Sequence, residues 1–358
     1  MYLSSKFFRA LLGIMIFFYS LTTSTFANSD NNETVKKSPW LFAPLLSSTP
    51  KLGTSFGAMG GYLYKFDELS PVSTFVLIGT YSSTDSYVSG LFGKLYFDED
   101  KQRLMAGGVY GKVNNEYNDF LGSGQEFKTT DNIHALFARY QYRIEGDWFI
   151  GAQIVMSNYT ISGSDRFSDA VLEFIGLNGF ESNGVGLVIE RDTRDNQNSP
   201  SAGSSFLIHS LAYRKSFGGE ENFDVYALKS SKFFKHYKEY VLALRLDGRW
   251  SVDAPAGAYS TVDLRGYTPG QYLAPHMTTF EAEERIPITK KWGTHIFTGL
   301  AGLYGNSSSS NDNVNWYPSI GAGINYMLKE EEKMIIRADI AMGEAGNYGF
   351  YIQFGQAF

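Results

Sequence analysis

The run Leu264-Arg265-Gly266-Tyr267 combines residue types that can fix a loop in one position. A guanidinium stays charged and offers five donors in a rigid fork, so it can bind carboxylates in a bidentate way. Glycine permits backbone conformations and close approaches that other residues resist. Arg265 would need acidic partners to hold such a loop, and the alternative is a solvated loop arginine.

The candidate partners of this arginine are Glu283 and Asp339. Glu283 shares its strand parity with Glu281 and Arg285, and side chains of one parity project from the same face of a strand. If both strands line one interior, these acids face the same space as Arg265. We therefore expect Arg265 to pair with Glu283 or Asp339.

A second group alternates acidic and basic side chains ahead of a turn. Its members are Asp192, Arg194, Asp195, Asn196, Pro200 and Gly203. Carboxylate and amide oxygens suit Ca²⁺. However, Arg194 opposes a cation, and the spacing is not that of an EF-hand loop. The pattern favours a hairpin with internal ion pairs and Asx-type turns.

Catalytic chemistry has little support in the sequence. His209 and Ser210 adjoin, but neighbours on a strand face opposite ways. No Gly-x-Ser-x-Gly motif occurs, and the absence of cysteine excludes thiolate metal sites. We expect no catalytic, cofactor-binding or metal site. An outer-membrane lipolytic enzyme is the least favoured alternative.

The composition points to a particular class of protein. The 358 residues include 24 Tyr and 28 Phe, a large aromatic load for a soluble domain, and mean hydropathy is −0.20. Aromatic girdles of membrane β-barrels carry such a load, and no later segment is apolar for long enough to be a membrane-spanning helix.

The N-terminus has the order of a secretory signal peptide. Lys6 and Arg9 precede the apolar run 11–21, and small residues lead to Ala27. The apolar run is shorter than the roughly 20 residues that span a bilayer. Cleavage after Ala27 would leave 29 basic and 37 acidic residues, a net charge of −8, which argues against a nucleic-acid partner.

The rest of the chain reads as a leader followed by strands. We expect residues 1–27 to be the signal peptide, 28–50 a periplasmic leader without room for a separate domain, and 51–358 the barrel. In the segment 239–252, Leu242, Leu244 and Leu246 alternate with polar residues. A soluble sandwich would bury these leucines, whereas a membrane barrel would turn them to lipid and the charges to a wet interior.

The last segment, 348–358, alternates down to the final residue. Phe354 and Phe358 share one parity, which resembles the C-terminal signal of bacterial outer-membrane barrels. That pattern implies an outward-facing aromatic row that ends on Phe358. Gln356 stands where the signal more often has an apolar residue.

Together these stretches resemble the BamA/TamA superfamily of outer-membrane barrels, also called the bacterial surface antigen family. The run 264–267 looks like the Val/Ile-Arg-Gly-Phe/Tyr motif of a long extracellular loop that folds into the lumen. The run 190–196 with Pro200 and Gly203 looks like the periplasmic Asp-Thr-Arg-Asp-Asn…Pro…Gly hairpin. The segments 283–288 and 335–341 look like strands after the loop.

One position departs from the family pattern. Members often have Phe-x-Asp-x-Gly in the next strand, but this chain has Gly299 at the position of the acid, in the stretch 297–301. The missing acid puts the usual arginine clamp in doubt and shifts weight to Glu283 or Asp339.

The resemblance implies sixteen strands. Five candidates follow the loop and ten precede it, where eleven are needed, so we place the missing strand in 115–127 or 166–180. A total of fourteen remains the alternative.

Three functions are compatible with such a barrel. It could assist insertion or translocation of proteins at the outer membrane, with other outer-membrane or periplasmic proteins as partners. It could be a channel or scaffold without insertase activity, or the enzyme described above. Members of the family with assembly roles usually carry POTRA domains, which we do not expect here. Fold-level analogy does not choose among these functions.

Overall fold

A computed structural model describes residues 38–49, 52–117, 120–163, 166–175, 177, 179–305 and 314–358. The chain divides into two units, 1–38 and 39–358. The account below is of the second unit. The predicted signal peptide, residues 1–27, lies outside the described residues.

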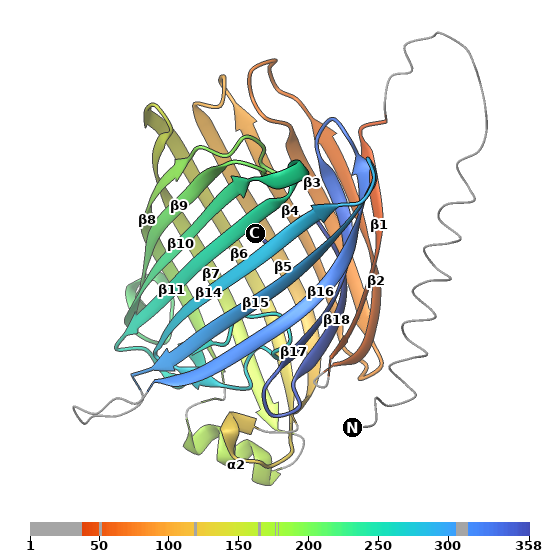
Figure 1. The fold of residues 1–358 in the computed structure, drawn as a ribbon. Helices are drawn as coiled ribbons and strands as arrows, with labels where there is room; N and C mark the ends of the chain where they lie inside the picture. The colour runs from red at the N-terminus through yellow and green to blue at the C-terminus, as the bar shows by residue number, and fades with distance from the viewer. Residues whose placement is uncertain are drawn as a thin grey trace, which may run out of the picture. The chain divides into compact units, whose positions relative to one another are not determined.

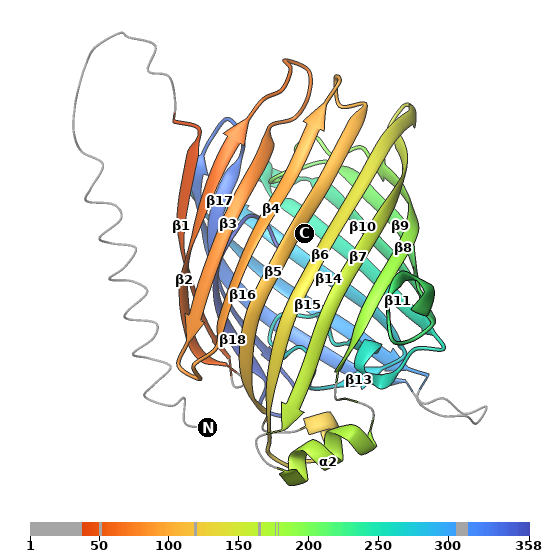
Figure 2. The same cartoon turned by 180° about the vertical axis from the view of Figure 1, so that it is seen from behind.

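Sixteen antiparallel strands close into one barrel (Figures 1 and 2). The strands before the long loop are β1 (Trp40–Thr49), β2 (Gly53–Tyr64), β3 (Ser73–Ser82), β4 (Tyr87–Phe97), β5 (Gln102–Tyr117), β6 (Phe127–Glu145), β7 (Trp148–Gly163), β8 (Gly179–Asp192), β9 (Gly203–Tyr213), β10 (Phe223–Lys235) and β11 (Val241–Val252). Those after it are β14 (His276–Pro287), β15 (Trp292–Tyr304), β16 (Asn315–Lys329), β17 (Met334–Gly343) and β18 (Tyr348–Phe354). This confirms the predicted fold class and the count of sixteen.

Short elements lie between the strands. The loop between β11 and β14 contains the two-stranded ribbon β12 (Ser260–Thr261) and β13 (Leu273–Ala274), and the short 3-10 helix Ala256–Ala258. Helix α2 (Arg166–Phe174) joins β7 to β8. Other 3-10 turns span Phe120–Gly122, Lys215–Phe217 and Tyr237–Glu239. No helix among the described residues is long and apolar enough to cross a membrane.

The missing strand is β1, which corrects two predictions. The segment 28–50 is not entirely a leader, since residues 40–49 pair along β2. The segments 115–127 and 166–180 contain parts of neighbouring strands, a loop and α2 rather than an additional strand. Residues 40–45 are apolar on both parities and include Pro44, so they lack the alternation that marks a strand. Pro44 lies where β1 has no partner on β18, a position where strand proline is tolerated.

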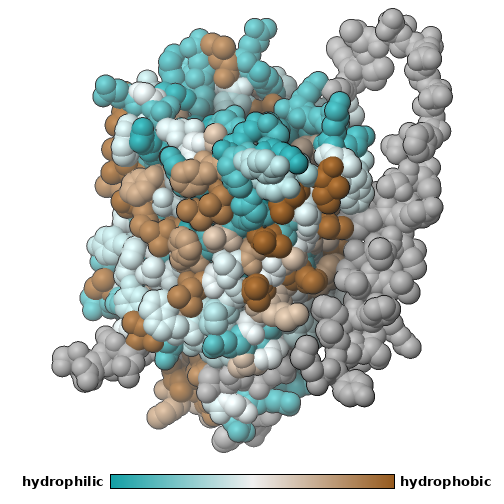
Figure 3. Space-filling view, in the orientation of Figure 1, coloured by the Kyte–Doolittle hydropathy of each residue, from teal (hydrophilic) through white to brown (hydrophobic). Residues whose placement is uncertain are grey.

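The two faces of the barrel wall differ as alternation predicts. On β14, Thr279, Glu281 and Glu283 are buried, whereas Phe280 between them is 47% exposed. Leu77 and Leu187 are exposed in the same way on other strands. Figure 3 shows hydrophobic side chains over the middle of the wall. In a closed barrel the buried parity is the inward face, and the exposed apolar parity forms a lipid-facing belt.

Candidate functional site

Arg265 contacts three carboxylates on the inward faces of β14 and β17. Its Nη2 lies 2.6 Å from Glu281 Oε1, and its Nη1 lies 2.9 Å from both Glu283 Oε2 and Asp339 Oδ2. The structure therefore brings together both acids proposed as partners. It also adds Glu281, which sequence parity could not separate from Glu283 because both face the same side of one strand.

Two further arginines join this cluster, and His295 Nε2 contacts Asp339 Oδ1 at 2.8 Å. Arg285 Nε lies 2.9 Å from Glu283 Oε1, and Arg337 Nη2 lies 2.8 Å from Glu283 Oε2 and 2.9 Å from Asp339 Oδ2. We call Arg265, Arg285, Arg337, Glu281, Glu283 and Asp339 the arginine hub. Its three cations and three carboxylates balance, which offsets the cost of taking these charges out of water.

Phe297 and Leu264 occupy the space around the guanidinium. The Arg265 Cζ lies 3.4 Å from the centre of the Phe297 ring, a cation–π contact. A Cβ at Gly299 would stand 2.6 Å from the side chain of Leu264. Gly299, where the predicted resemblance would place an acid, is therefore next to the loop's own leucine, and the hub carboxylates come from β14 and β17 instead.

Gly266 lies where no larger residue fits. Its φ is +97°, and a Cβ would stand 3.0 Å from the backbone carbon of Met342 on β17. Its N–H donates to Tyr351 Oη at 3.1 Å, and Ser319 Oγ donates to the carbonyl of Arg265. Left-handed backbone and close approach both require glycine here.

Tyr267 anchors the other side of the loop. Its Oη donates to the Pro318 carbonyl at 2.7 Å and accepts from the Glu344 N–H at 2.9 Å. Its ring meets those of Tyr272 and Tyr317 edge-on. Aromatic packing and satisfied polar ends hold the loop on β16 and β17.

The second predicted group lies in the turn between β8 and β9. Arg194 contacts Asp192 through Nη2 at 2.8 Å, and Gln197 Nε2 donates to the same Asp192 oxygen at 2.6 Å. Asn196 Oδ1 accepts the N–H of Asn198 at 2.9 Å, an Asx-type turn. Among the described residues, no group of acids and histidines is placed to hold a metal ion.

Asp195, Pro200 and Gly203 close this turn. Burial raises the pKa of Asp195, but bonds from the hydroxyl and N–H of Ser201 outweigh it and hold the pKa below its usual value. The Pro200 carbonyl accepts from Arg285 at 3.3 Å, so the turn touches the hub. Gly203 has a φ of +90°, and a Cβ there would clash with the Thr193 carbonyl.

The C-terminal prediction is wrong beyond Phe354. Strand β18 ends at Phe354, and the chain turns at Gly355, whose φ is +85°. Phe358 packs against Phe233, Val241 and Ala243 of the inward faces of β10 and β11, so it does not continue an outward row. The Phe358 carbonyl accepts from Arg285 Nη2 at 2.8 Å. Arg285 of the hub thus donates a hydrogen bond that holds the C-terminal residue on the inward side of the wall.

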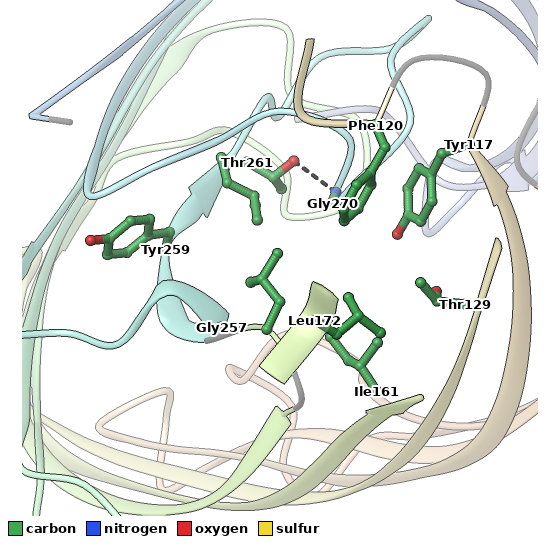
Figure 4. A pocket seen from close by; sticks show the side chains of 11 residues that line it. Tyr117, Phe120, Thr129, Ile161, Leu172, Gly257, Tyr259, Thr261 and Gly270 are labelled. Carbon is green, nitrogen blue, oxygen red and sulfur yellow. Dashed lines mark hydrogen bonds between the residues drawn. The ribbon is translucent and has the colours of Figure 1, made fainter. Parts of the chain in front are cut away.

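A small cavity lies between the loop and α2 (Figure 4). It measures about 160 Å³ and is lined by Tyr117 of β5, Ile161 of β7, Leu172 of α2 and Tyr259 of the loop, among others. Sequence reasoning missed this cavity, because its lining comes from β5, β6, β7, α2 and the loop, which are far apart in the chain.

His209 and Ser210 are separated by the barrel wall. His209 Nδ1 contacts Gln153 Nε2 at 2.9 Å, whereas Ser210 Oγ bonds the Leu187 N–H. This pair therefore cannot act as base and nucleophile.

No family model and no curated protein matches the chain. Solved structures do. BamA from Haemophilus ducreyi lacking POTRA domains 1–3 matches with a TM-score of 0.57 at 13% identity, over 89% of this chain and 70% of that one. CdiB from Acinetobacter baumannii matches with a TM-score of 0.60 at 10% identity, over 89% and 60%. CdiB from Escherichia coli matches with a TM-score of 0.60 at 8% identity, over 92% and 66%.

The chain spans under two thirds of the length of either CdiB. At identities this low the similarity concerns the fold alone, and it confirms the predicted resemblance in fold. The protein has the sixteen-stranded outer-membrane β-barrel fold of BamA and CdiB.

Proposed function

We propose that this protein belongs to the BamA/TamA superfamily and assists the insertion or translocation of proteins at the bacterial outer membrane. The partners would be other outer-membrane or periplasmic proteins, in contact with outer-membrane lipid. The observation that carries the proposal is the join between the first and last strands of the barrel.

The join between β1 and β18 is short. Only Leu46–Ser48 pair with Phe350–Ile352, whereas β1 pairs with β2 along its whole length. Because β18 ends and the tail turns inward, residues 40–45 have no partner on the β18 side within the described chain. Unpaired strand edges can template a further strand. This supports a seam that opens to receive a client strand.

The loop supports the same proposal. Its Arg265 bonds to the inward faces of β14 and β17, and its tyrosines pack on β16 and β17. A loop held in the lumen by these contacts would brace the wall beside the seam and narrow the pore. Removing the hub contacts would therefore affect the seam side of the barrel first.

A pair of cysteines across the seam tests the mechanism, because the natural chain has no cysteine. Ser48 and Phe350 are direct partners on β1 and β18. In cells depleted of the wild type, S48C/F350C should support normal levels of other outer-membrane barrels only under reducing conditions. Oxidation should lock the seam and lower those levels.

The matched control shares one cysteine. Thr54 is the partner of Ser48 on β2, so S48C/T54C forms a bridge that leaves the seam free. Oxidation of this variant should not change barrel levels. If depletion itself leaves other barrels unchanged, or if the locked seam is fully active, the assembly role is wrong.

A channel is the second candidate, because part of the lumen is accessible to water. Lys229 has the inward parity of β10 yet is exposed, and Phe92 on the inward face of β4 is 36% exposed. Conductance in a planar bilayer, with the loop intact and with residues 262–268 replaced by a short glycine linker, separates the two functions. Steady conductance by the intact protein favours a channel, and conductance only after loop replacement favours a plugged barrel.

A further inference from the structure

Four basic side chains gather on the wall formed by β6, β9, β10 and β11. They are Arg139, His209, Lys229 and Arg249, and we call them the basic wall. Their neighbours of opposite parity are exposed to the outside, among them Tyr140, Ile208 and Tyr226. The basic wall therefore faces the lumen.

The strand register brings these side chains together. Ala227 on β10 is the direct partner of His209 on β9 and of Arg249 on β11. Lys229 is the next inward residue on β10. Arg139 joins them through Gln153, since it donates to Gln153 Oε1 at 2.7 Å and Gln153 Nε2 contacts His209 Nδ1 at 2.9 Å. His209 and Arg249 therefore flank the small side chain of Ala227 from the two neighbouring strands.

The cations of the basic wall lack acidic partners. Arg249 bonds only to the hydroxyls of Ser251 and Ser260, at 3.1 and 3.0 Å. Within the part of the chain that the structure describes, none of Arg139, Lys229 and Arg249 forms an ion pair with a carboxylate.

The nearest acids are engaged elsewhere. Asp247 lies beside Lys229 but contacts Arg245, at 3.7 Å. Glu190 acts on Arg139 only at longer range, and it contacts Arg103 at 3.5 Å. Asp247 is the direct partner of Lys229 on β11, so the three cations of the basic wall face one acid at close range and keep a net positive charge.

We propose that the basic wall is a binding site for a phosphate-class oxyanion in the lumen. Guanidinium and ammonium groups are the usual ligands of phosphate oxygens, and the arginine fork can bind two of them. The exposure of Lys229 shows that solvent reaches the site. The oxyanion is either a free phosphate or the headgroup of an anionic lipid.

The test is a titration of the purified barrel in an uncharged detergent with inorganic phosphate, followed by isothermal calorimetry at low salt. Saturable binding is expected, and it should weaken as chloride is added because exposed charges are screened. The variant K229Q/R249Q should bind at least tenfold more weakly. Monomeric short-chain phosphatidic acid, with short-chain phosphatidylcholine as the neutral comparison, forms the second arm.

The matched control is K232Q/K235Q, which removes the same amount of charge but takes both charges from β10. Lys232 has the outward parity of β10, and Lys235 is exposed at the strand end. Its affinity should equal that of the wild type, and unheated gel mobility checks that each barrel is folded. Binding of phosphatidic acid alone, lost in K229Q/R249Q, identifies a lipid headgroup, and binding of inorganic phosphate identifies a free anion. No binding in either arm, or equal binding by all variants, overturns the site.

Discussion

The arginine hub and the basic wall lie in the same lumen but handle charge in opposite ways. In the hub, three guanidiniums meet three carboxylates, and Glu283 alone contacts all three arginines. In the basic wall, Arg139 and Arg249 bond only to amide and hydroxyl oxygens among the residues that the structure describes. The hub is internally neutral and is fixed to the loop, whereas the basic wall keeps positive charge next to solvent.

This difference separates structure from binding. Buried charges that are fully paired with one another have no free donors or acceptors for a ligand. Removing one of them leaves the others buried without a partner. Cations without acids are costly to keep in a dry interior, but they cost less where water reaches them. We therefore expect mutations in the hub to act on stability and mutations in the basic wall to act on ligand binding.

The largest effect is expected from Glu283→Gln. The substitution leaves three arginines with two acids, and Glu283 itself has no exposed surface, so the free energy of unfolding should fall by about 3–5 kcal/mol. Urea unfolding in detergent micelles, followed by tryptophan fluorescence, measures it. Glu284→Gln, one residue away and facing outward toward His236, should change it far less. Equal effects would show that the hub does not stabilise the barrel.

Gly266→Ala should come next. The added methyl group combines an unfavourable positive φ with a contact to the Met342 backbone, at a cost of about 1–3 kcal/mol. Protease cleavage within residues 253–275 should also become faster. Gly346→Ala is the control, because Gly346 also has a positive φ, +74°, but has open space around it. A Gly346→Ala variant as unstable as Gly266→Ala would remove the close approach as a cause.

Arg249→Gln tests the basic wall in the same way as Glu283→Gln tests the hub. Loss of a cation that has no acidic partner should change the free energy of unfolding by less than about 1 kcal/mol. The same urea titration applies. A loss as large as that of Glu283→Gln would mean that the basic wall is structural, like the hub.

The smallest effect is expected at Asp195. Its folded-state pKa is depressed, so its contribution to stability is present above the unfolded pKa and is lost as pH falls through the folded pKa. Since the side chain is a third exposed, the contribution should be no more than about 1 kcal/mol. Asp195→Asn should therefore lower stability at pH 7, and this loss should shrink as the pH falls below the ordinary pKa of the carboxyl group. Unfolding midpoints of the wild type and of Asp195→Asn, measured from neutral to acidic pH, test this prediction, and Glu145→Gln is the control.

Much of the fold could be predicted because alternation in a strand is a local property. The segments predicted before and after the loop became β2–β11 and β14–β18. Strands such as β14 bury one parity and expose the other, although β17 buries both. Strand β1 was not predicted, because its first half is apolar on both faces and contains Pro44. Helix α2, which lies outside the barrel wall, has no counterpart in a pattern of period two.

The sequence by itself determined the barrel, the loop motif around Arg265 and the two acids that contact this arginine. Residue type and strand parity can both be read directly from the amino-acid sequence. The tertiary structure alone decided that Glu281 joins them, that Phe358 turns inward, and that Arg139 approaches His209 through Gln153. These outcomes depend on strand register and closure. Both bring residues from distant strands to one height in the lumen, and no local pattern encodes that.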